Sequence, residues 1–200
     1  MTTGQPERIV IRDVAIIDAT GREPQGRGDV LVEGGRIKAM GSVGELAPGV
    51  AAVDGAGTTL LPGLADAHVH FALIGTKGDH GSDTWIRHVL AVAGFIERAL
   101  QEGFTTVRDA GGLEPAWAEA VGAGALSGPR ILPAGSALSQ TGGHADNRQR
   151  HEALHASQAV PGLVAGHAIV DGVDEVRRAA REQLRRGATQ IKLMASGGVI

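Results

Sequence analysis

From residue 63 onward, short apolar stretches alternate with longer amphipathic ones, and this alternation constrains the fold more than any other feature. Buried strands are predicted at four apolar stretches, namely 63–70, 105–108, 129–135 and 189–194. Helical spacing of apolar residues predicts helices between them, at 84–102, 114–123 and 174–186. Alternating strands and helices are typical of parallel βαβ units. We therefore predict an α/β fold, with four strands that fit the first half of a (β/α)8 TIM-type barrel.

The residues before this region have a different pattern. Residues 8–18 are apolar and rich in β-branched side chains, which predicts a strand with a kink near Arg12. A hairpin is predicted over 29–40, with a tight turn at Gly34-Gly35, and a short strand follows at 58–61. These elements predict a small β-sheet module.

Two further features complete the predicted organisation. Pro62-Gly63 ends the β-sheet module, so we expect one domain over residues 1–61 and a second over residues 62–200. Residues 138–168 are rich in Gly, His and Asn and have weak periodicity. This segment is long for a connection without secondary structure, and we interpret it as a functional excursion.

Composition excludes several classes of protein. The formal net charge is -3 and no basic run occurs, which argues against a nucleic-acid partner. Cysteine is absent, which excludes disulfides, thiolate metal ligands and a cysteine nucleophile. No apolar run approaches the roughly 20 residues that span a bilayer, and the N-terminal residues lack the apolar core of a signal peptide. We expect a cytoplasmic protein that acts on a small molecule, without a membrane partner, and that is free to form a homo-oligomer.

Two histidines at the end of the first buried strand are candidate metal ligands. His68 and His70 are two residues apart, so a strand presents both imidazoles on one face. At the C-terminal end of a barrel strand, that face points into the site. Two such histidines can bind one divalent cation, although histidines with this spacing often only pack or form hydrogen bonds. The flanking Leu61-Pro-Gly-Leu64 and Phe71 favour the metal site.

The sequence around these histidines, LPGLADAHVHF (residues 61–71), resembles the first barrel strand of the amidohydrolase superfamily. Three later segments resemble the ends of its second, third and fourth strands and come in the same order: GFTTVRDAGG at 103–112, SQTGGHAD at 139–146 and IKLMASGGV at 191–199. The branch they resemble most is the imidazolonepropionase-like group, which includes Xaa-Pro dipeptidases. The resemblance covers essentially the whole chain. It implies that the first domain is the N-terminal part of a small β-sandwich.

Lys192 has a specific role in this resemblance. It lies in an apolar strand, where an unpaired ammonium ion is costly to bury. The resemblance implies that carbon dioxide carboxylates the amine and that the carbamate bridges two divalent metal ions. His68, His70 and Lys192 are then the metal ligands, and zinc suits imidazole and carbamate oxygen best among the divalent ions. A lysine that extends to solvent or pairs with an aspartate is the alternative.

The resemblance also implies an activity. Two cations separated by roughly 3.5–4 Å can share a hydroxide and polarise a carbonyl. We expect a metal-dependent amide hydrolase that acts on dipeptides or N-acyl amino acids such as Xaa-Pro. One alternative is a deaminase or cyclic-amide hydrolase of the same superfamily, in which the bridging lysine is generally absent, and another is a non-catalytic fragment. The remaining catalytic groups, two histidines and one aspartate on later strands, are expected outside these 200 residues, so the chain alone is expected to be inactive.

Several other residues have two interpretations. His144 either contacts the substrate or is an ordinary loop histidine. Arg108 and Asp109 either orient ligands or form an internal ion pair, and we expect the ion pair. Asp66 either supports a histidine ligand or is a hydrogen-bonded core acid. Other polar residues are expected to be solvated, namely His151, His155, His167 and the arginines of the 174–186 helix.

Overall fold

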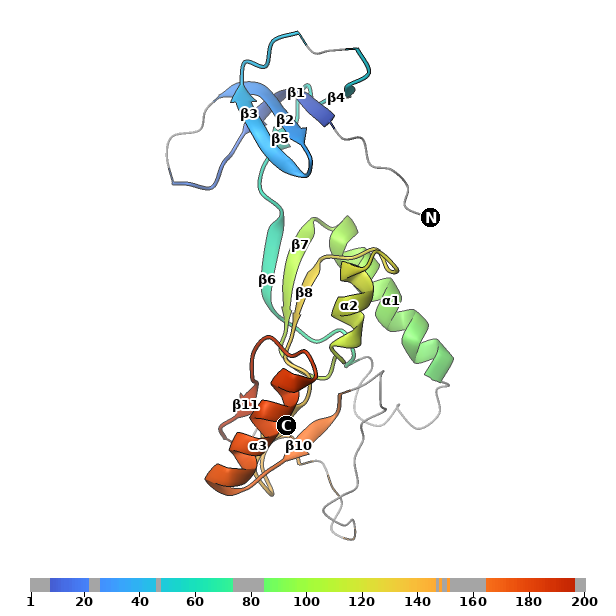
Figure 1. Cartoon of the computed structure of the whole chain (residues 1–200), viewed down its shortest axis with the longest axis vertical. Coiled ribbons are helices and arrows are strands. Elements are labelled where there is room, and N and C mark those ends of the chain that lie inside the picture. The colour runs from blue at the N-terminus through green and yellow to red at the C-terminus, as the bar shows by residue number, and fades with distance from the viewer. Residues whose placement is uncertain are drawn as a thin grey trace. The chain divides into compact units, whose positions relative to one another are not determined.

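The computed structural model describes residues 8–21, 26–45, 48–73, 85–146, 148, 151 and 165–196 (Figure 1). The chain divides into two compact units, Met1–Pro62 and Gly63–Ile200. None of the helices in the described ranges is long and apolar enough to cross a membrane. His155 lies outside the described residues.

The first unit is a single β-sheet. Its strands are β1 (Arg8–Ile16), β2 (Arg27–Glu33), β3 (Arg36–Gly41), β4 (Ala51–Asp54) and β5 (Thr59–Leu60). Their order is β3-β2-β1-β4, with β5 also paired to β1. The β1–β2 and β2–β3 pairs are antiparallel, whereas β4 and β5 run parallel to β1.

Backbone geometry explains the two bends predicted in this unit. The hairpin between β2 and β3 turns at Gly34 and Gly35, whose φ angles of 55° and 71° favour glycine. The predicted kink in β1 is confirmed, because Asp13 has a φ of 52° and the pairing register shifts between Ile11 and Val14. Both features are local, which is why the sequence predicts them.

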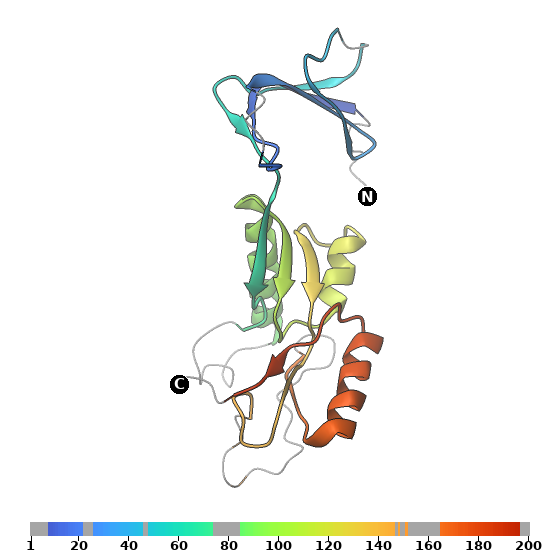
Figure 2. The same ribbon diagram turned by 90° about the vertical axis from the view of Figure 1, so that its left-hand side faces the viewer.

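The second unit begins with a parallel sheet in the order β6-β7-β8 (Figure 2). The strands β6 (Leu64–Val69), β7 (Phe104–Asp109) and β8 (Arg130–Pro133) alternate with the helices α1 (Trp85–Gln101) and α2 (Ala116–Gly122). Val92 and Ile96 of α1 are fully buried in one cluster with Val107 of β7. The predicted strand–helix alternation is confirmed for this part of the chain.

A second parallel sheet, in the order β10-β9-β11, follows. Its strands are β9 (Ala137–Ser139), β10 (His167–Ile169) and β11 (Leu193–Met194), and α3 (Gly172–Arg185) connects β10 to β11. Its core consists of Leu138 of β9, Ala179 of α3 and Val170, which directly follows β10. The interpretation of 138–168 as an excursion without regular structure is therefore wrong at both ends, where short strands pair with each other.

The third predicted strand, 129–135, is also divided. β8 ends at Pro133 and β9 begins at Ala137, because Gly135 adopts a φ of 69° between them. The Gln183 side chain of α3 stabilises the break, since its Oε1 accepts a hydrogen bond from the Ser136 backbone N–H at 2.9 Å. Residues 189–194 run beside both β8 and β9. Thr189 N–H donates to the Pro133 carbonyl of β8 at 2.8 Å, and the Lys192 carbonyl accepts from Leu138 N–H of β9 at 2.9 Å.

Candidate active site

His68 and His70 lie at the C-terminal end of β6, and their rings approach each other closely. The two Nε2 atoms are 3.2 Å apart, and the ring centroids are 5.1 Å apart. The other ring nitrogen of His70, Nδ1, lies 2.9 Å from the Gly111 carbonyl oxygen. A carbonyl can only accept, so Nδ1 carries the hydrogen, and the Nε2 lone pair faces His68, where it can accept a hydrogen bond or bind a cation.

This separation fits a shared cation. Zinc binds histidine nitrogens at about 2.0–2.1 Å in tetrahedral geometry, which places two such nitrogens roughly 3.3 Å from each other. The carbonyl behind His70 Nδ1 is the kind of contact that orients a metal-binding imidazole. The sequence-based pairing of His68 with His70 is thus matched by a geometry that suits a divalent cation.

Lys192, which directly precedes β11 of the second sheet, acts electrostatically on His68. Its positive charge is the main reason why the pKa of His68 lies below the usual value, with burial and the charge of His70 as further causes. A lowered pKa keeps His68 neutral, as a metal ligand must be. Lys192 is half-buried. Among the described residues, no group of three His, Asp or Glu side chains could hold a metal ion, so the histidine pair would need other ligands.

Asp109, at the end of β7, holds the backbone around His70. Its Oδ2 accepts from Phe71 N–H at 2.9 Å, and its Oδ1 accepts from Gly111 N–H at 3.0 Å. The side chain is completely buried, and this burial raises the pKa of the Asp109 carboxyl despite the backbone N–H groups of Phe71, Gly111 and Leu113, which lower it. Asp109 therefore fixes both the residue after His70 and the residue whose carbonyl orients the His70 ring.

The expected ion pair between Arg108 and Asp109 is wrong. Neighbouring residues of a strand point to opposite faces. The Arg108 guanidinium is exposed and donates to the Ala67 carbonyl at 2.6 Å, whereas Asp109 is buried on the other face. Asp66 accepts a hydrogen bond from the His68 backbone N–H at 2.9 Å, so it supports the histidine strand through the main chain.

Two further histidines have a buried ring nitrogen. His144 follows β9, and His167 begins β10. The Nδ1 atoms of both are buried without a hydrogen-bond partner among the residues that the structure describes. Burial lowers the pKa of His167, and the charges of His144 and His70 lower it further. The expectation of a solvated His167 is wrong, because the three-residue strand that buries it has no pattern that the sequence could reveal.

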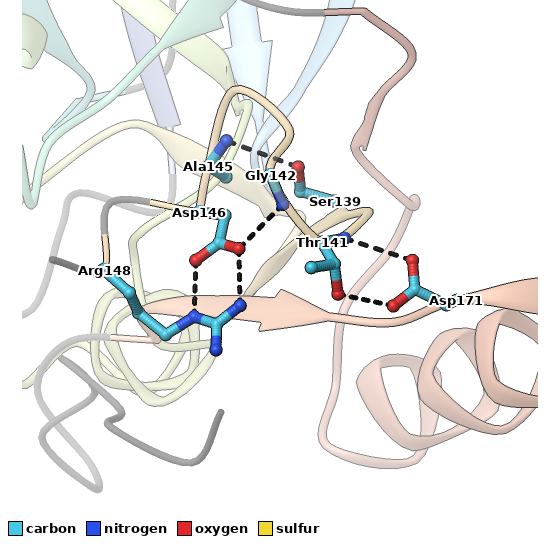
Figure 3. Close-up of polar contacts among 7 residues, drawn as sticks. All are labelled: Ser139, Thr141, Gly142, Ala145, Asp146, Arg148 and Asp171. Carbon is cyan, nitrogen blue, oxygen red and sulfur yellow. Dashed lines mark hydrogen bonds and ion pairs between the residues drawn. The ribbon is translucent and has the colours of Figure 1, made fainter. Parts of the chain in front are cut away.

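A polar network supports the loop that carries His144 (Figure 3). Asp146 accepts from Gly142 N–H at 2.8 Å and from two guanidinium nitrogens of Arg148, each at 2.5 Å. These contacts hold the pKa of the Asp146 carboxyl well below its usual range. Thr141 binds Asp171 through its backbone N–H at 3.1 Å and its hydroxyl at 2.5 Å, which ties this loop to the start of α3.

The arginines of α3 have mixed environments. Arg177 and Arg185 form exposed ion pairs within the helix, with Asp174 and Glu182, as expected for a solvated face. Arg186 instead pairs at 2.6 Å with Glu114, whose side chain is only 5% exposed. His151, which is exposed, agrees with its predicted solvated position.

Comparisons with known proteins give one consistent family. The profile of the Amidohydrolase family matches residues 59–200. An ochratoxinase from Aspergillus niger is 40% identical over an alignment 159 residues long, which covers 70% of this chain and 32% of that enzyme.

Solved structures agree. A prolidase complexed with N-methylphosphonate-L-proline is 38% identical with a TM-score of 0.86, covering 96% of this chain and 47% of the prolidase. A Xaa-Pro dipeptidase with methionine bound in its active site is 30% identical with a TM-score of 0.77, covering 96% of this chain and 48% of the dipeptidase. The chain thus spans about half the length of these solved relatives.

Proposed function

Because the chain belongs to the amidohydrolase family, we propose that the protein is a metal-dependent hydrolase that cleaves the amide bonds of dipeptides or N-acyl amino acids, including Xaa-Pro. The observation that carries this proposal is the 3.2 Å distance between the Nε2 atoms of His68 and His70. The Gly111 carbonyl orients the His70 ring of this pair. The names of the prolidase and the Xaa-Pro dipeptidase support a substrate with proline as the released residue.

We propose that His68, His70 and Lys192 hold the metal, with Lys192 carboxylated to a carbamate that bridges two zinc ions. The residues fit: the Gly111 carbonyl orients the His70 ring, and the half-buried Lys192 lies near enough to His68 for its charge to be the main cause of the lowered His68 pKa. Bound there, the divalent ions would supply Lewis acidity and a nucleophilic water at neutral pH. His144 would contact the substrate, because it has a buried ring nitrogen to offer.

The same proposal covers the architecture. Residues 62–200 would form the first half of a (β/α)8 barrel, in which the ends of parallel strands meet at the active-site face. Residues 1–61 would form part of a β-sandwich. The two parallel sheets of the second unit and the strands of the first unit support this assignment.

A deaminase of the same superfamily is the competing function. Deamination of a ring amine proceeds with one metal ion, so a bridging lysine would have no purpose there. The test is a paired assay on the full-length, zinc-loaded protein. Ninhydrin detects amino acids released from a dipeptide library, and ammonia detection follows a panel of heteroaromatic ring amines. We expect turnover of dipeptides and no release of ammonia; turnover confined to the ring amines would overturn the proposal.

A further inference from the structure

The pairing of β6 with β7 is irregular at the first proposed metal ligand. The two strands lie side by side in Figure 2, and two residues of β6, Ala67 and His68, lie opposite a single residue of β7, Arg108. Two regular pairs flank this position, Asp66 with Val107 and Val69 with Asp109. We call Ala67 and His68 the β6 bulge. Bulges are rare between parallel strands and frequent beside active sites, where they change the direction of a side chain.

Two charged side chains bind the backbone of the β6 bulge. The Arg108 guanidinium donates through Nε to the Ala67 carbonyl at 2.6 Å. The Asp66 carboxylate accepts from the His68 N–H at 2.9 Å. This carbonyl and this N–H belong to the same peptide group, the one that joins Ala67 to His68. A bulge disrupts the regular ladder of backbone hydrogen bonds, so the orientation of this peptide group depends on the two side chains.

The orientation of this peptide group sets the direction of the His68 side chain. A peptide group is planar, so turning it changes ψ of Ala67 and φ of His68 together and moves the His68 Cβ. Hydrogen bonds that involve a charged group are stronger than neutral ones, and here one lies on each side of the plane. Directly after the bulge the strands pair again, since the Ala110 N–H donates to the Val69 carbonyl at 2.9 Å. His68 is therefore fixed on both sides along the chain.

The direction of His68 matters because the two imidazoles have to converge. Residues two apart on a regular strand are separated by about 6.6 Å. The ring centroids of His68 and His70 are 5.1 Å apart and their Nε2 atoms 3.2 Å apart, so the rings lean toward each other. His70 is held in this position through its ring, by the Gly111 carbonyl. His68 is held through its main chain, by the contacts of the β6 bulge.

We propose that Arg108 and Asp66 are positioning residues that fix this peptide group and so aim the His68 imidazole at the shared metal ion. Both act through the main chain of His68 rather than on the metal itself. This inference rests on the proposed function, because it takes His68 and His70 as metal ligands. It gives the exposed Arg108 a role in the site in place of the ion pair that its position beside Asp109 suggested.

The first test measures the zinc affinity of the full-length protein by competition with a chelator. Arg108→Met removes the donor, whereas Arg108→Gln is equally neutral but keeps an N–H the same number of bonds from Cα as the arginine Nε. We expect Met to lower the affinity about tenfold, as loss of an outer partner of a ligating histidine does, and Gln to restore most of it. Asp66→Ala and Asp66→Asn form a second such pair, since Asn keeps an acceptor oxygen. The matched control is Arg177→Met, which alters an exposed ion pair and should leave the affinity unchanged.

The second test needs no metal. Hydrogen exchange at the His68 amide of the zinc-free, full-length protein reports directly on the held peptide group. We expect faster exchange in Arg108→Met and Asp66→Ala than in the unaltered protein, and nearly the original rate in Arg108→Gln and Asp66→Asn.

The two tests separate this inference from the proposed function. Unchanged zinc affinity in Arg108→Met, equal losses in Arg108→Met and Arg108→Gln, or the same His68 amide exchange in all variants would overturn the positioning role. If the amide exchange follows the expected order in a protein that binds no zinc or cleaves no dipeptide, the proposed function is overturned and the positioning of His68 stands.

Discussion

Replacing Asp109 with alanine should remove a residue that supports the proposed metal site while leaving the proposed metal ligands in place. The Asp109 carboxylate is the partner of two backbone N–H groups, those of Phe71 and Gly111, at 2.9 and 3.0 Å. All three residues are buried, so neither N–H can turn to water when the carboxylate is removed. Each buried donor left unpaired costs about 1–3 kcal/mol, so the free energy of unfolding should fall by about 2–6 kcal/mol. That is a large part of the roughly 5–15 kcal/mol that stabilises a typical domain.

The measurement is urea denaturation of the full-length protein, followed by circular dichroism. Hydrogen exchange should show faster exchange at the amides of Phe71 and Gly111. Asp54→Ala is the matched control, because the Asp54 carboxylate also accepts from a backbone N–H, that of Ala56 at 3.0 Å, but in an exposed position. The control should cost about 1 kcal/mol or less, since water replaces the lost acceptor.

The same substitution should weaken metal binding without removing a ligand. The Gly111 N–H donates to Asp109, and the Gly111 carbonyl orients the His70 ring, so loss of the Asp109 carboxylate should loosen the contact to His70. Loss of an outer partner of a ligating histidine typically lowers metal affinity about 10–100-fold, which competition with a chelator measures. An Asp109→Ala protein with unchanged amide exchange, stability within 1 kcal/mol of the original and unchanged metal affinity would refute the supporting role of this carboxylate.

Three other predictions concern separate parts of the chain. Lys192→Ala should abolish most activity and lower the zinc content, and short carboxylic acids should partly restore both; full activity without additives would show that no carbamate is needed. The pKa of Asp146 is lowered in the folded protein, so this ion pair stabilises the fold above the ordinary pKa of 3.8 and the contribution is lost as the pH falls below it. Acid titrations of stability should therefore be shallower in Asp146→Asn, and identical acid limbs would contradict the prediction. Gly128→Ala should destabilise by about 1–3 kcal/mol, because a Cβ there would lie 2.4 Å from Ile96 Cγ2, whereas Gly122→Ala in α2, with open space around it, should be neutral or stabilising in thermal unfolding.

Elements whose cause is local could be predicted from the sequence. The β2–β3 hairpin turns where two consecutive glycines allow positive φ angles. The helices α1 and α3 have apolar residues at helical spacing, and their observed bounds differ from the predicted ones by no more than a few residues. The His68–His70 pair could be anticipated because the two-residue period of a strand puts both rings on one face.

Features that depend on distant contacts could not be predicted. The break between β8 and β9 is stabilised by Gln183, which is 47 residues from Ser136 in the sequence. The strand β10 has three residues, too few to show a period, and it forms because β9 offers a free edge. Asp109 looked like the partner of its neighbour Arg108, yet its oxygens accept from the backbone of Phe71, just after β6, and of Gly111, just after β7.

The two glycine carbonyls between β7 and α2 have a consequence for anyone who would engineer this protein. Gly111 and Gly112 have φ angles of 128° and 97°, which side chains other than hydrogen rarely allow. Their consecutive carbonyls hold His70 on one side and Ala165 on the other. A redesign of the chain that precedes β10 therefore meets a fixed backbone contact at Ala165. Because Ala165 contributes only its backbone N–H to this contact, a side chain exchanged there leaves the hydrogen bond to Gly112 in place, whereas Ala165→Pro removes the donor.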